Sequence, residues 1–348
     1  MNQMSTKRPV GPVTRRIFAG VVVAQSAIVV TGGLVRLTGS GLGCPTWPEC
    51  APGSYVPTLE QAEGVHSYIE FGNRTLTFVL STVVIAAMVA AWRHRPRRPD
   101  LIVLSGLQLF GVAAQATLGG ITVLTGLHPA TVAAHFLVSS VLIAGAVVLL
   151  EVSGQGKDRR KSARGLGRGD HGGTSGDPGT ACIIGADGAS DTLPPVRREI
   201  RGLGGALLIV AALVLVMGTI VTGSGPHSGD AAAPARFGFD PHTVSWLHAD
   251  LVFLFLGLSV AMVMAVRLTN APSDTRRRAT AVLAVIVVQG AVGYLQYFTG
   301  VPAALVALHM VGACLVVITT VRLALALFLE SVPADEAQSR LATAARAG

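Results

Sequence analysis

Three histidines lie in apolar stretches of this chain at nearly the same distance from a proline. They follow it by six or seven residues: His135 after Pro129, His248 after Pro241 and His309 after Pro302. Proline is common in the first turn of a helix, so each imidazole is expected roughly 10 Å along its own helix. If these helices start on the same side of a membrane, the spacing predicts three imidazoles at one level.

The chemistry that such histidines support is haem ligation rather than zinc binding. A lone histidine inside an apolar helix is usually a packing residue, but three at one level favour a functional site, because polar groups in a membrane are costly. A histidine pair on facing helices suits haem iron better than zinc. We expect His248 and His309 to be the axial ligands of one haem, which is not covalently attached because the chain lacks Cys-x-x-Cys-His.

A fourth position at this level is occupied by Asn73, which lies seven residues after His66. By three- and four-residue spacing, Asn73 shares neighbouring rows of one helix with His66, Glu70 and Arg74. The residue that corresponds to Glu70 in the second half of the chain is Ser245, so the acid occurs in one half only. Two interpretations of Glu70 stay open: an ion pair with Arg74 near the membrane surface, and a catalytic acid that faces a second site.

Two stretches of the chain read as copies of each other, QATLGGITVLTGLHPATVAAHF from Gln115 and QGAVGYLQYFTGVPAALVALHM from Gln289. At one constant offset, Gln115 matches Gln289, Gly119 matches Gly293 and His135 matches His309. A duplicated apolar unit that ends in a histidine predicts an internal repeat with two related cofactor sites.

The elements that must position these residues are membrane-spanning helices. The 348 residues are 51% hydrophobic and only 13% charged, which is far below the charge of a soluble protein. About 20 apolar residues are needed to cross a bilayer. The chain contains eight such blocks, at about 17–37, 67–92, 101–124, 130–151, 202–222, 243–266, 279–299 and 302–328.

Basic residues in alternate connections predict the orientation of these spans. They include Arg15 and Arg16, Arg93 to Arg98, Arg197 to Arg201, and Arg276 to Arg278. The positive-inside rule places all of them, and both termini, in the cytoplasm. The net charge of +8 therefore needs no nucleic-acid partner. The first apolar block is too long for a signal-peptide core, and no transit peptide is recognised, so a bacterial plasma membrane is expected.

The expected architecture is an all-α polytopic membrane protein with two pseudo-symmetric four-helix bundles. Gly, Arg and Asp dominate the central segment, which is expected to be a disordered cytoplasmic linker. The predicted regions are a cytoplasmic tail at 1–16, an N-terminal half at 17–151, the linker at 152–200, a C-terminal half at 201–328 and a cytoplasmic tail at 329–348.

The cysteines divide by compartment. Cys44 and Cys50 share an outer loop, where disulfides form and persist, and a structural bridge is favoured over a redox switch. Cys182 is expected to be a free cytoplasmic thiol, and Cys314 a packing residue in the last span.

The chain resembles the haem A synthase family. The similar stretches are TGGLVRLTGSGLGCPTWPEC at 31–50, YIEFGNR at 68–74, GGITVLTGLHPATVAAH at 119–135, the region of His248, and TGVPAALVALH at 299–309. The first stretch, with its cysteine pair, is the most specific. The resemblance covers both membrane halves but neither the linker nor the tails.

The resemblance implies eight helices in two bundles and the oxidation of the C8 methyl of haem O to a formyl group, which gives haem A for cytochrome oxidases. It implies a haem b between His248 and His309, and a substrate haem in the N-terminal half with His135 as a ligand. It also implies a functional Glu70 and a Cys44–Cys50 disulfide.

One position departs from the family pattern, because many members have a second histidine where this chain has Asn73. Either the substrate iron keeps an open position, or His66 replaces the missing ligand from two turns away.

A mechanism follows as a hypothesis. The carboxylate of Glu70 shuttles protons or stabilises positive charge on the methyl carbon. Arg36 and Arg74 either bind haem propionates or extend their side chains to the membrane surface. Expected partners are haem O, haem O synthase, the assembly of cytochrome oxidase, membrane lipid and an electron donor that the sequence does not identify.

Two other classes compete with this interpretation. One is a quinol-linked electron carrier that contains haem b and modifies no haem. The other is a repeat-built transporter, whose site would lie near the midplane on broken helices. The histidines lie nearer the outer face, and the spans are unbroken, which disfavours the transporter.

Overall fold

The part of the chain that the structure describes is built from α-helices. A computed structural model describes residues 10–154, 198–227, 229–230 and 235–329. The helices in these residues are α1 (Pro12–Leu37), α2 (Val65–Arg93), α3 (Pro99–Leu124), α4 (Pro129–Gly154), α6 (Arg198–Ser224), α7 (Pro241–Leu268), α8 (Ser273–Phe298) and α9 (Ala303–Leu329). All eight are long and apolar enough to cross a membrane. The all-α, multi-pass prediction is confirmed.

Most helices continue past the apolar blocks that predicted them. The largest difference is at α8, which begins at Ser273 rather than at 279 and so includes Arg276 to Arg278. Arginine is a good helix former, and its long side chain can extend to the membrane surface while the backbone stays helical. For the same reason α1 begins inside the predicted tail at 1–16.

The ends of the predicted linker at 152–200 are also helical, since α4 ends at Gly154 and α6 begins at Arg198. The rest of the linker, most of both predicted tails and Cys182 lie outside the described residues.

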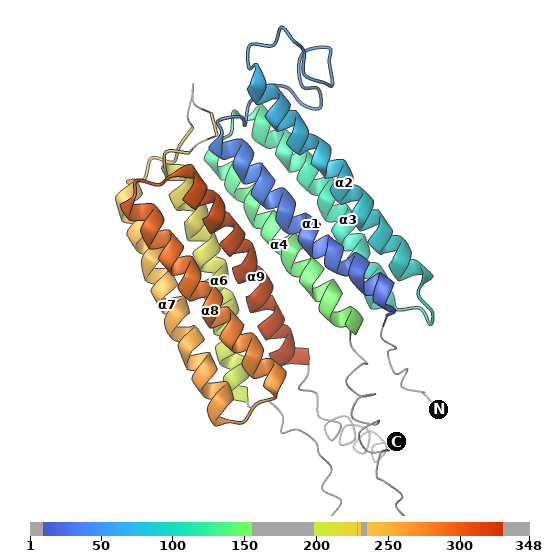
Figure 1. Cartoon of the computed structure of the whole chain (residues 1–348), viewed down its shortest axis with the longest axis vertical. Coiled ribbons are helices and arrows are strands. Elements are labelled where there is room, and N and C mark those ends of the chain that lie inside the picture. The colour runs from blue at the N-terminus through green and yellow to red at the C-terminus, as the bar shows by residue number, and fades with distance from the viewer. Residues whose placement is uncertain (1–9, 155–197, 228, 231–234, 330–348) are drawn as a thin grey trace, which may run out of the picture.

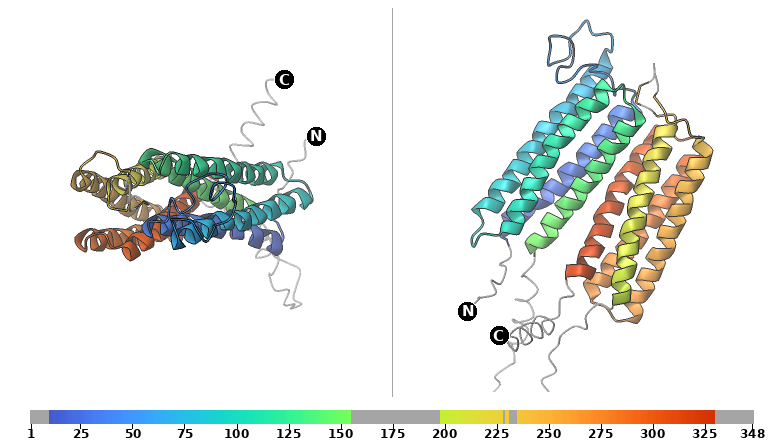
Figure 2. Two further views of the ribbon diagram at one scale, coloured as in Figure 1. Left: turned by 90° about the horizontal axis from the view of Figure 1, so that it is seen from above. Right: turned by 180° about the vertical axis from the view of Figure 1, so that it is seen from behind.

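The helices form two bundles that lie side by side (Figures 1 and 2). In the N-terminal bundle each of α1 to α4 packs against the next, and α1 packs against α4. The C-terminal bundle, α6 to α9, repeats this pattern. Between the bundles α4 packs on α9, α1 on α9 and α4 on α6. These contacts stay the same if α1 is exchanged with α6 and α4 with α9. They are consistent with the predicted pseudo-symmetry, which stays a prediction.

Each bundle has its own apolar core, and a smaller cluster joins the two. The N-terminal core includes Phe18, Leu101 and Leu149, and the C-terminal core includes Phe255, Met262 and Leu323. The joining cluster contains Val29, Ile143, Cys314 and Val317. Cys314 is free and buried there, which confirms its prediction as a packing residue.

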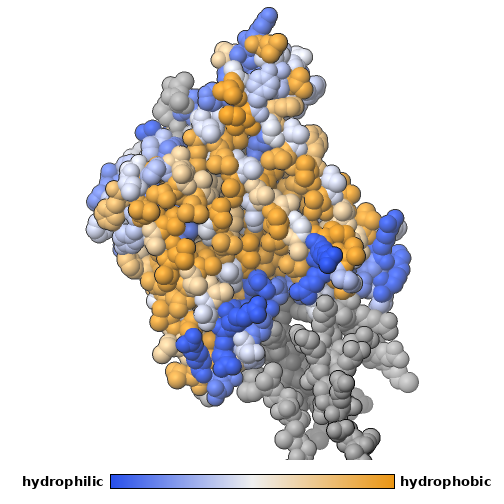
Figure 3. All heavy atoms as spheres, viewed as in Figure 1, coloured by the Kyte–Doolittle hydropathy of each residue, from blue (hydrophilic) through white to orange (hydrophobic). Residues whose placement is uncertain are grey.

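Hydrophobic residues form a band across the middle of the molecule, with hydrophilic residues toward its ends (Figure 3). Polar contacts join the two bundles at both ends of this band. At the end where α1 begins, Glu151 of α4 pairs with Arg278 of α8 at 3.0 Å and with Arg322 of α9 at 2.8 Å. At the opposite end, Arg36 of α1 donates to the carbonyls of Thr222 at 3.0 Å and His227 at 2.6 Å. The relative position of the two halves is therefore fixed at both ends.

Candidate functional site

Four residues on alternate helices each carry a buried polar atom that has no hydrogen-bond partner among the described residues. They are Asn73 on α2, His135 on α4, His248 on α7 and His309 on α9, which we call the polar layer. In the three histidines the atom is Nδ1, and in Asn73 it is Oδ1. An unsatisfied buried polar group costs free energy and requires an explanation. The polar layer thus consists of the three histidines that the sequence predicts as ligands and of Asn73, which the sequence places at the same level.

Every residue of the polar layer lies against a glycine on the preceding helix. A Cβ placed on Gly119 would lie 3.4 Å from Cε1 of His135, one on Gly218 3.4 Å from Cε1 of His248, and one on Gly293 3.2 Å from Cε1 of His309. A Cβ on Gly32 would lie 3.8 Å from Nδ2 of Asn73. The missing side chain at each glycine leaves room for the ring or amide beside it.

The two matched glutamines hold the backbone beneath two of the rings. Nε2 of Gln115 donates to the carbonyl of His135 at 2.8 Å, and Nε2 of Gln289 donates to the carbonyl of His309 at 2.7 Å. These bonds tie α3 to α4 and α8 to α9 at the level of the histidines. The sequence repeat thus corresponds to a repeated contact.

The histidines of the C-terminal bundle lie close enough to interact electrostatically with each other. They belong to α7 and α9, which are diagonal in the bundle and are not among the helix pairs that pack closely. The carbonyl of Val214 lies close to the His248 ring, but no hydrogen bond reaches its Nδ1 atom. Asn73 and His135 occupy the equivalent diagonal helices, α2 and α4, in the N-terminal bundle.

This donor set fits haem better than a compact metal site. No group of three or more His, Cys, Asp or Glu side chains that could hold a metal ion occurs in the described residues. No described residue hydrogen-bonds Nε2 of His135, His248 or His309, and Nε2 is not enclosed as Nδ1 is. His248 and His309, whose Nε2 atoms no described residue hydrogen-bonds, could therefore hold a haem between their two helices.

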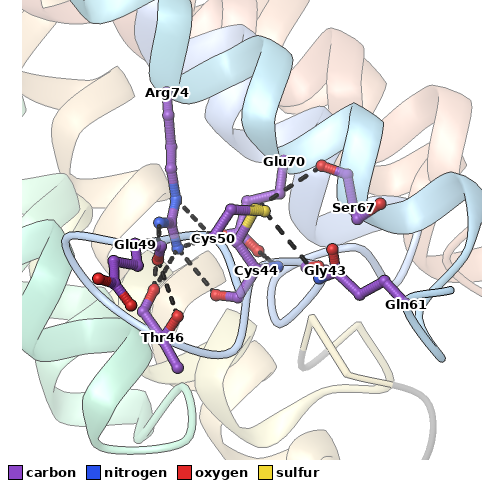
Figure 4. A network of polar contacts seen from close by, with 9 residues as sticks. All are labelled: Gly43, Cys44, Thr46, Glu49, Cys50, Gln61, Ser67, Glu70 and Arg74. Atoms are coloured by element: carbon purple, nitrogen blue, oxygen red, sulfur yellow. Dashed lines mark hydrogen bonds and ion pairs between the residues drawn. A yellow bond between two sulfur atoms is a disulfide. The ribbon is translucent and has the colours of Figure 1, made fainter. Parts of the chain in front are cut away.

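The predicted acid, Glu70, lies three residues before Asn73 on α2 and is hydrogen-bonded on both carboxylate oxygens (Figure 4). Its Oε2 accepts the backbone N–H of Cys44 at 2.7 Å. Its Oε1 accepts from Nε and Nη2 of Arg74, at 3.0 and 2.6 Å. The carboxylate is 7% exposed, so this is a largely buried ion pair. The ion-pair interpretation of Glu70 therefore describes its contacts, while its catalytic role stays a prediction.

Arg74 also holds the outer loop between α1 and α2, residues 38–64, which contains Cys44 and Cys50 and which we call the cysteine loop. Its guanidinium donates to the carbonyls of Cys44 at 2.8 Å, of Thr46 at 3.1 Å and of Glu49 at 3.1 Å. Cys44 and Cys50 form a disulfide in this loop. Five-donor guanidinium groups suit such multiple carbonyl contacts. The loop conformation thus depends on the same ion pair that fixes the acid.

The cysteine loop reaches across the top of the N-terminal bundle to α3. A Cβ on Gly120 would clash with the indole of Trp47, so the ring lies directly on the backbone of Gly120. The next residue, Gly119, faces His135. The loop therefore contacts α3 one residue away from the glycine that faces His135.

The remaining predicted residues lie nearer the outer end. Nδ1 of His66 is hydrogen-bonded to the hydroxyl of Ser40 at 2.8 Å, two turns from Asn73. Arg36 binds the carbonyls described above, and Arg74 binds the cysteine loop. Propionate binding by either arginine and iron ligation by His66 stay predictions.

The glycines and glutamines of the site were not predicted to have a role. The repeat matches Gly119 with Gly293 and Gln115 with Gln289. These matches could have indicated a shared structural role. Gly32 and Gly218 carried none, because they lie outside the matched stretches. Trp47 lies within the motif at 31–50, but a loop has no periodic pattern from which the contacts of its side chains could be predicted.

Comparison with known proteins identifies the family. Residues 15–227, more than half of the chain, match the family model COX15-CtaA, described as cytochrome oxidase assembly protein. Similar curated proteins are the haem A synthases of Geobacillus kaustophilus, 33% identical over 116 residues, and of Lysinibacillus sphaericus, 37% identical over 129 residues.

These matches cover 33% and 37% of this chain, and 35% and 40% of the relatives, so each spans less than half of the curated protein. A third haem A synthase, from Geobacillus thermodenitrificans, is 30% identical over 43% of this chain and 45% of its own length. The chain therefore belongs to the COX15-CtaA family of cytochrome oxidase assembly proteins, and this confirms the resemblance that its motifs predict.

Proposed function

We propose that this protein is a haem A synthase, an oxidoreductase that converts the C8 methyl of haem O to a formyl group. The observation that carries the proposal is the polar layer, in which four equivalent positions hold a histidine pair in one bundle and a histidine with an asparagine in the other. The names of the relatives support the same activity.

In the C-terminal bundle, His248 and His309 would hold a haem b through their Nε2 atoms. Haem b, when bound, supplies electron transfer between a donor and the reaction site. Gly218 and Gly293 set the position of the two rings, and Gln289 fixes the backbone of His309. Such outer contacts orient a ligand and keep it ready to bind.

In the N-terminal bundle, His135 would bind the iron of haem O, with Gly119 and Gln115 in the positioning roles. The cysteine loop, held by Arg74 and by Trp47 on Gly120, would close the outer side of this site and exclude water. Exclusion of water strengthens every electrostatic interaction in a site.

The contacts of Glu70 favour the electrostatic role over the proton shuttle. Both of its oxygens already accept hydrogen bonds from the protein, which fixes the carboxylate in one position. A fixed carboxylate instead stabilises positive charge that develops on the methyl carbon, without reorganisation during the reaction.

The cellular setting follows the orientation of the spans. The protein would lie in a bacterial plasma membrane with both termini in the cytoplasm. It would receive haem O from a haem O synthase, deliver haem A to cytochrome oxidase assembly, and take electrons through a donor that contacts the C-terminal bundle.

Pigment analysis tests the proposal. The full chain and its His135→Ala variant are each co-expressed with a source of haem O, and the haems of membranes and purified protein are extracted and separated. The wild type is expected to yield haem A and the variant none. Haem b alone in the wild type would instead favour a quinol-linked carrier, and a colourless protein would favour a transporter.

A further inference from the structure

The polar layer contains one residue that is not a histidine. Asn73 shares two properties with His135, His248 and His309: it lies against a glycine, and it carries a buried atom without a partner. Its helix, α2, is the second of its bundle, as α7 with His248 is. No described residue hydrogen-bonds either its Oδ1 or its Nδ2. A side-chain amide with two donors and an acceptor is thus left unused at the level of the histidines.

An amide cannot replace the missing imidazole as an iron ligand. Haem iron in proteins is held by imidazole, thiolate, thioether or phenolate groups. Glu70 is bound by Arg74 and Cys44. His66 lies two turns of α2 further from the centre of the span than Asn73, where its Nδ1 is hydrogen-bonded to Ser40. On the diagonal helix, no described residue hydrogen-bonds Nε2 of His135.

We propose that Asn73 marks a binding position for a small exogenous ligand, such as a diatomic gas or azide, on the iron of the haem in the N-terminal bundle. The inference rests on the proposed function, because it requires a haem at His135. The amide of Asn73 donates a hydrogen bond to that ligand. The histidine pair of the C-terminal bundle leaves no such position, so the two haems differ in ligand binding.

Asn73 packs less tightly against its glycine than the three histidines do. A Cβ on Gly32 would lie 3.8 Å from Nδ2, which is ordinary van der Waals contact, whereas the corresponding distances at the histidines are 3.2 to 3.4 Å. Toward the outer end, Arg74 holds the cysteine loop, and Trp47 packs on Gly120, next to the glycine that faces His135.

Carbon monoxide tests the open position. The full-length protein is purified after co-expression with a haem O source, reduced with dithionite and titrated with carbon monoxide, and the Soret difference spectrum is recorded. About half of the bound haem, the fraction held by His135, is expected to bind carbon monoxide. In Asn73→His that fraction falls to the level of the C-terminal site, because a second imidazole fills the position.

The matched control is the opposite substitution, histidine to asparagine, at the equivalent position of the C-terminal bundle. In His248→Asn the C-terminal haem is expected to gain carbon monoxide binding while the N-terminal haem keeps it. For the amide itself, Asn73→Leu should retain carbon monoxide binding but raise the Kd of azide for the oxidised protein by about 10-fold, because a hydrogen bond to a charged ligand is lost.

The outcomes separate this inference from the proposed function. Two haems per chain with no carbon monoxide binding would overturn the inference and leave the proposed function standing. Carbon monoxide binding that persists unchanged in Asn73→His would also overturn it, as would a His248→Asn protein that keeps its haem without binding the gas. A chain that binds no haem would overturn both.

Discussion

The two bundles of this protein have the same helix packing but differ at two places. In the polar layer, α7 contributes His248 where α2 contributes Asn73. At the outer end, the N-terminal bundle carries a long loop that is closed by a disulfide and tied to Glu70 and Arg74. A bundle with two imidazoles suits a permanently held haem. A bundle with one imidazole, a fixed acid and a cover suits a haem that enters, reacts and leaves.

The largest expected effect comes from separating the acid from its partner. Arg74→Ala leaves the 7% exposed Glu70 without its counter-charge and frees the loop carbonyls, so it should destabilise the protein by about 3 kcal/mol. Thermal unfolding in detergent measures this. The control is Glu70→Gln, which keeps an acceptor for Cys44 and should cost less.

Arg74→Ala also tests whether the destabilisation is confined to the N-terminal bundle. After Arg74→Ala the haem b content should be unchanged, because no described contact of Arg74 reaches the C-terminal bundle. Equal losses of both haems would show that the two bundles do not behave independently.

Removing the disulfide should have the next largest effect. The bridge closes a loop with a sequence separation of 6, and the loop-closure model gives about 2 kcal/mol for its loss. The double variant Cys44→Ser, Cys50→Ser is compared with the wild type by its melting temperature and by haem A yield. We expect both to fall while haem b is retained; an unchanged haem A yield would contradict the covering role of the loop.

Glycine substitutions test the positions of the rings. Gly119→Ala and Gly293→Ala each place a Cβ against a histidine, at 3.4 and 3.2 Å, and should weaken haem retention in their own bundle by about 1 kcal/mol or more. Gly106→Ala and Gly290→Ala, on the same helices with nothing within 4 Å, are the matched controls. Quantifying each haem after detergent washing distinguishes the two sets, and equal loss in the controls would refute the steric explanation.

The smallest effect is expected at the glutamines. Gln115→Leu and Gln289→Leu each remove one hydrogen bond to a histidine carbonyl, which should cost about 1 kcal/mol. Each change should lower the retention of one haem only, as measured by pyridine haemochrome spectra. A loss of both haems from either variant would argue against separate sites.

The similar depth of three histidines on their helices could be predicted because helical geometry is periodic. A proline that starts a helix and a fixed number of residues determine the level of His135, His248 and His309 before any contact is known. The same periodicity predicted that Glu70 and Arg74 could pair, at a spacing of four.

The cysteine loop could not be predicted in this way. Arg74 binds three loop carbonyls, and Trp47 packs on Gly120. Both contacts depend on the path of the loop backbone, which has no repeating pattern in the sequence. The glycines opposite the rings were also missed, since a helical glycine becomes informative only when the side chain facing it is known.

The assignment of one haem to each bundle is tested most directly by a crossed pair of ligand variants. His135→Ala and the double variant His248→Ala, His309→Ala are purified after co-expression with a haem O source, and the haem types in each are separated and quantified. We expect His135→Ala to keep haem b and lose haem O and haem A, and the double variant to lose haem b and still bind haem O. If both variants lost the same haem, the division of roles between the bundles would be contradicted.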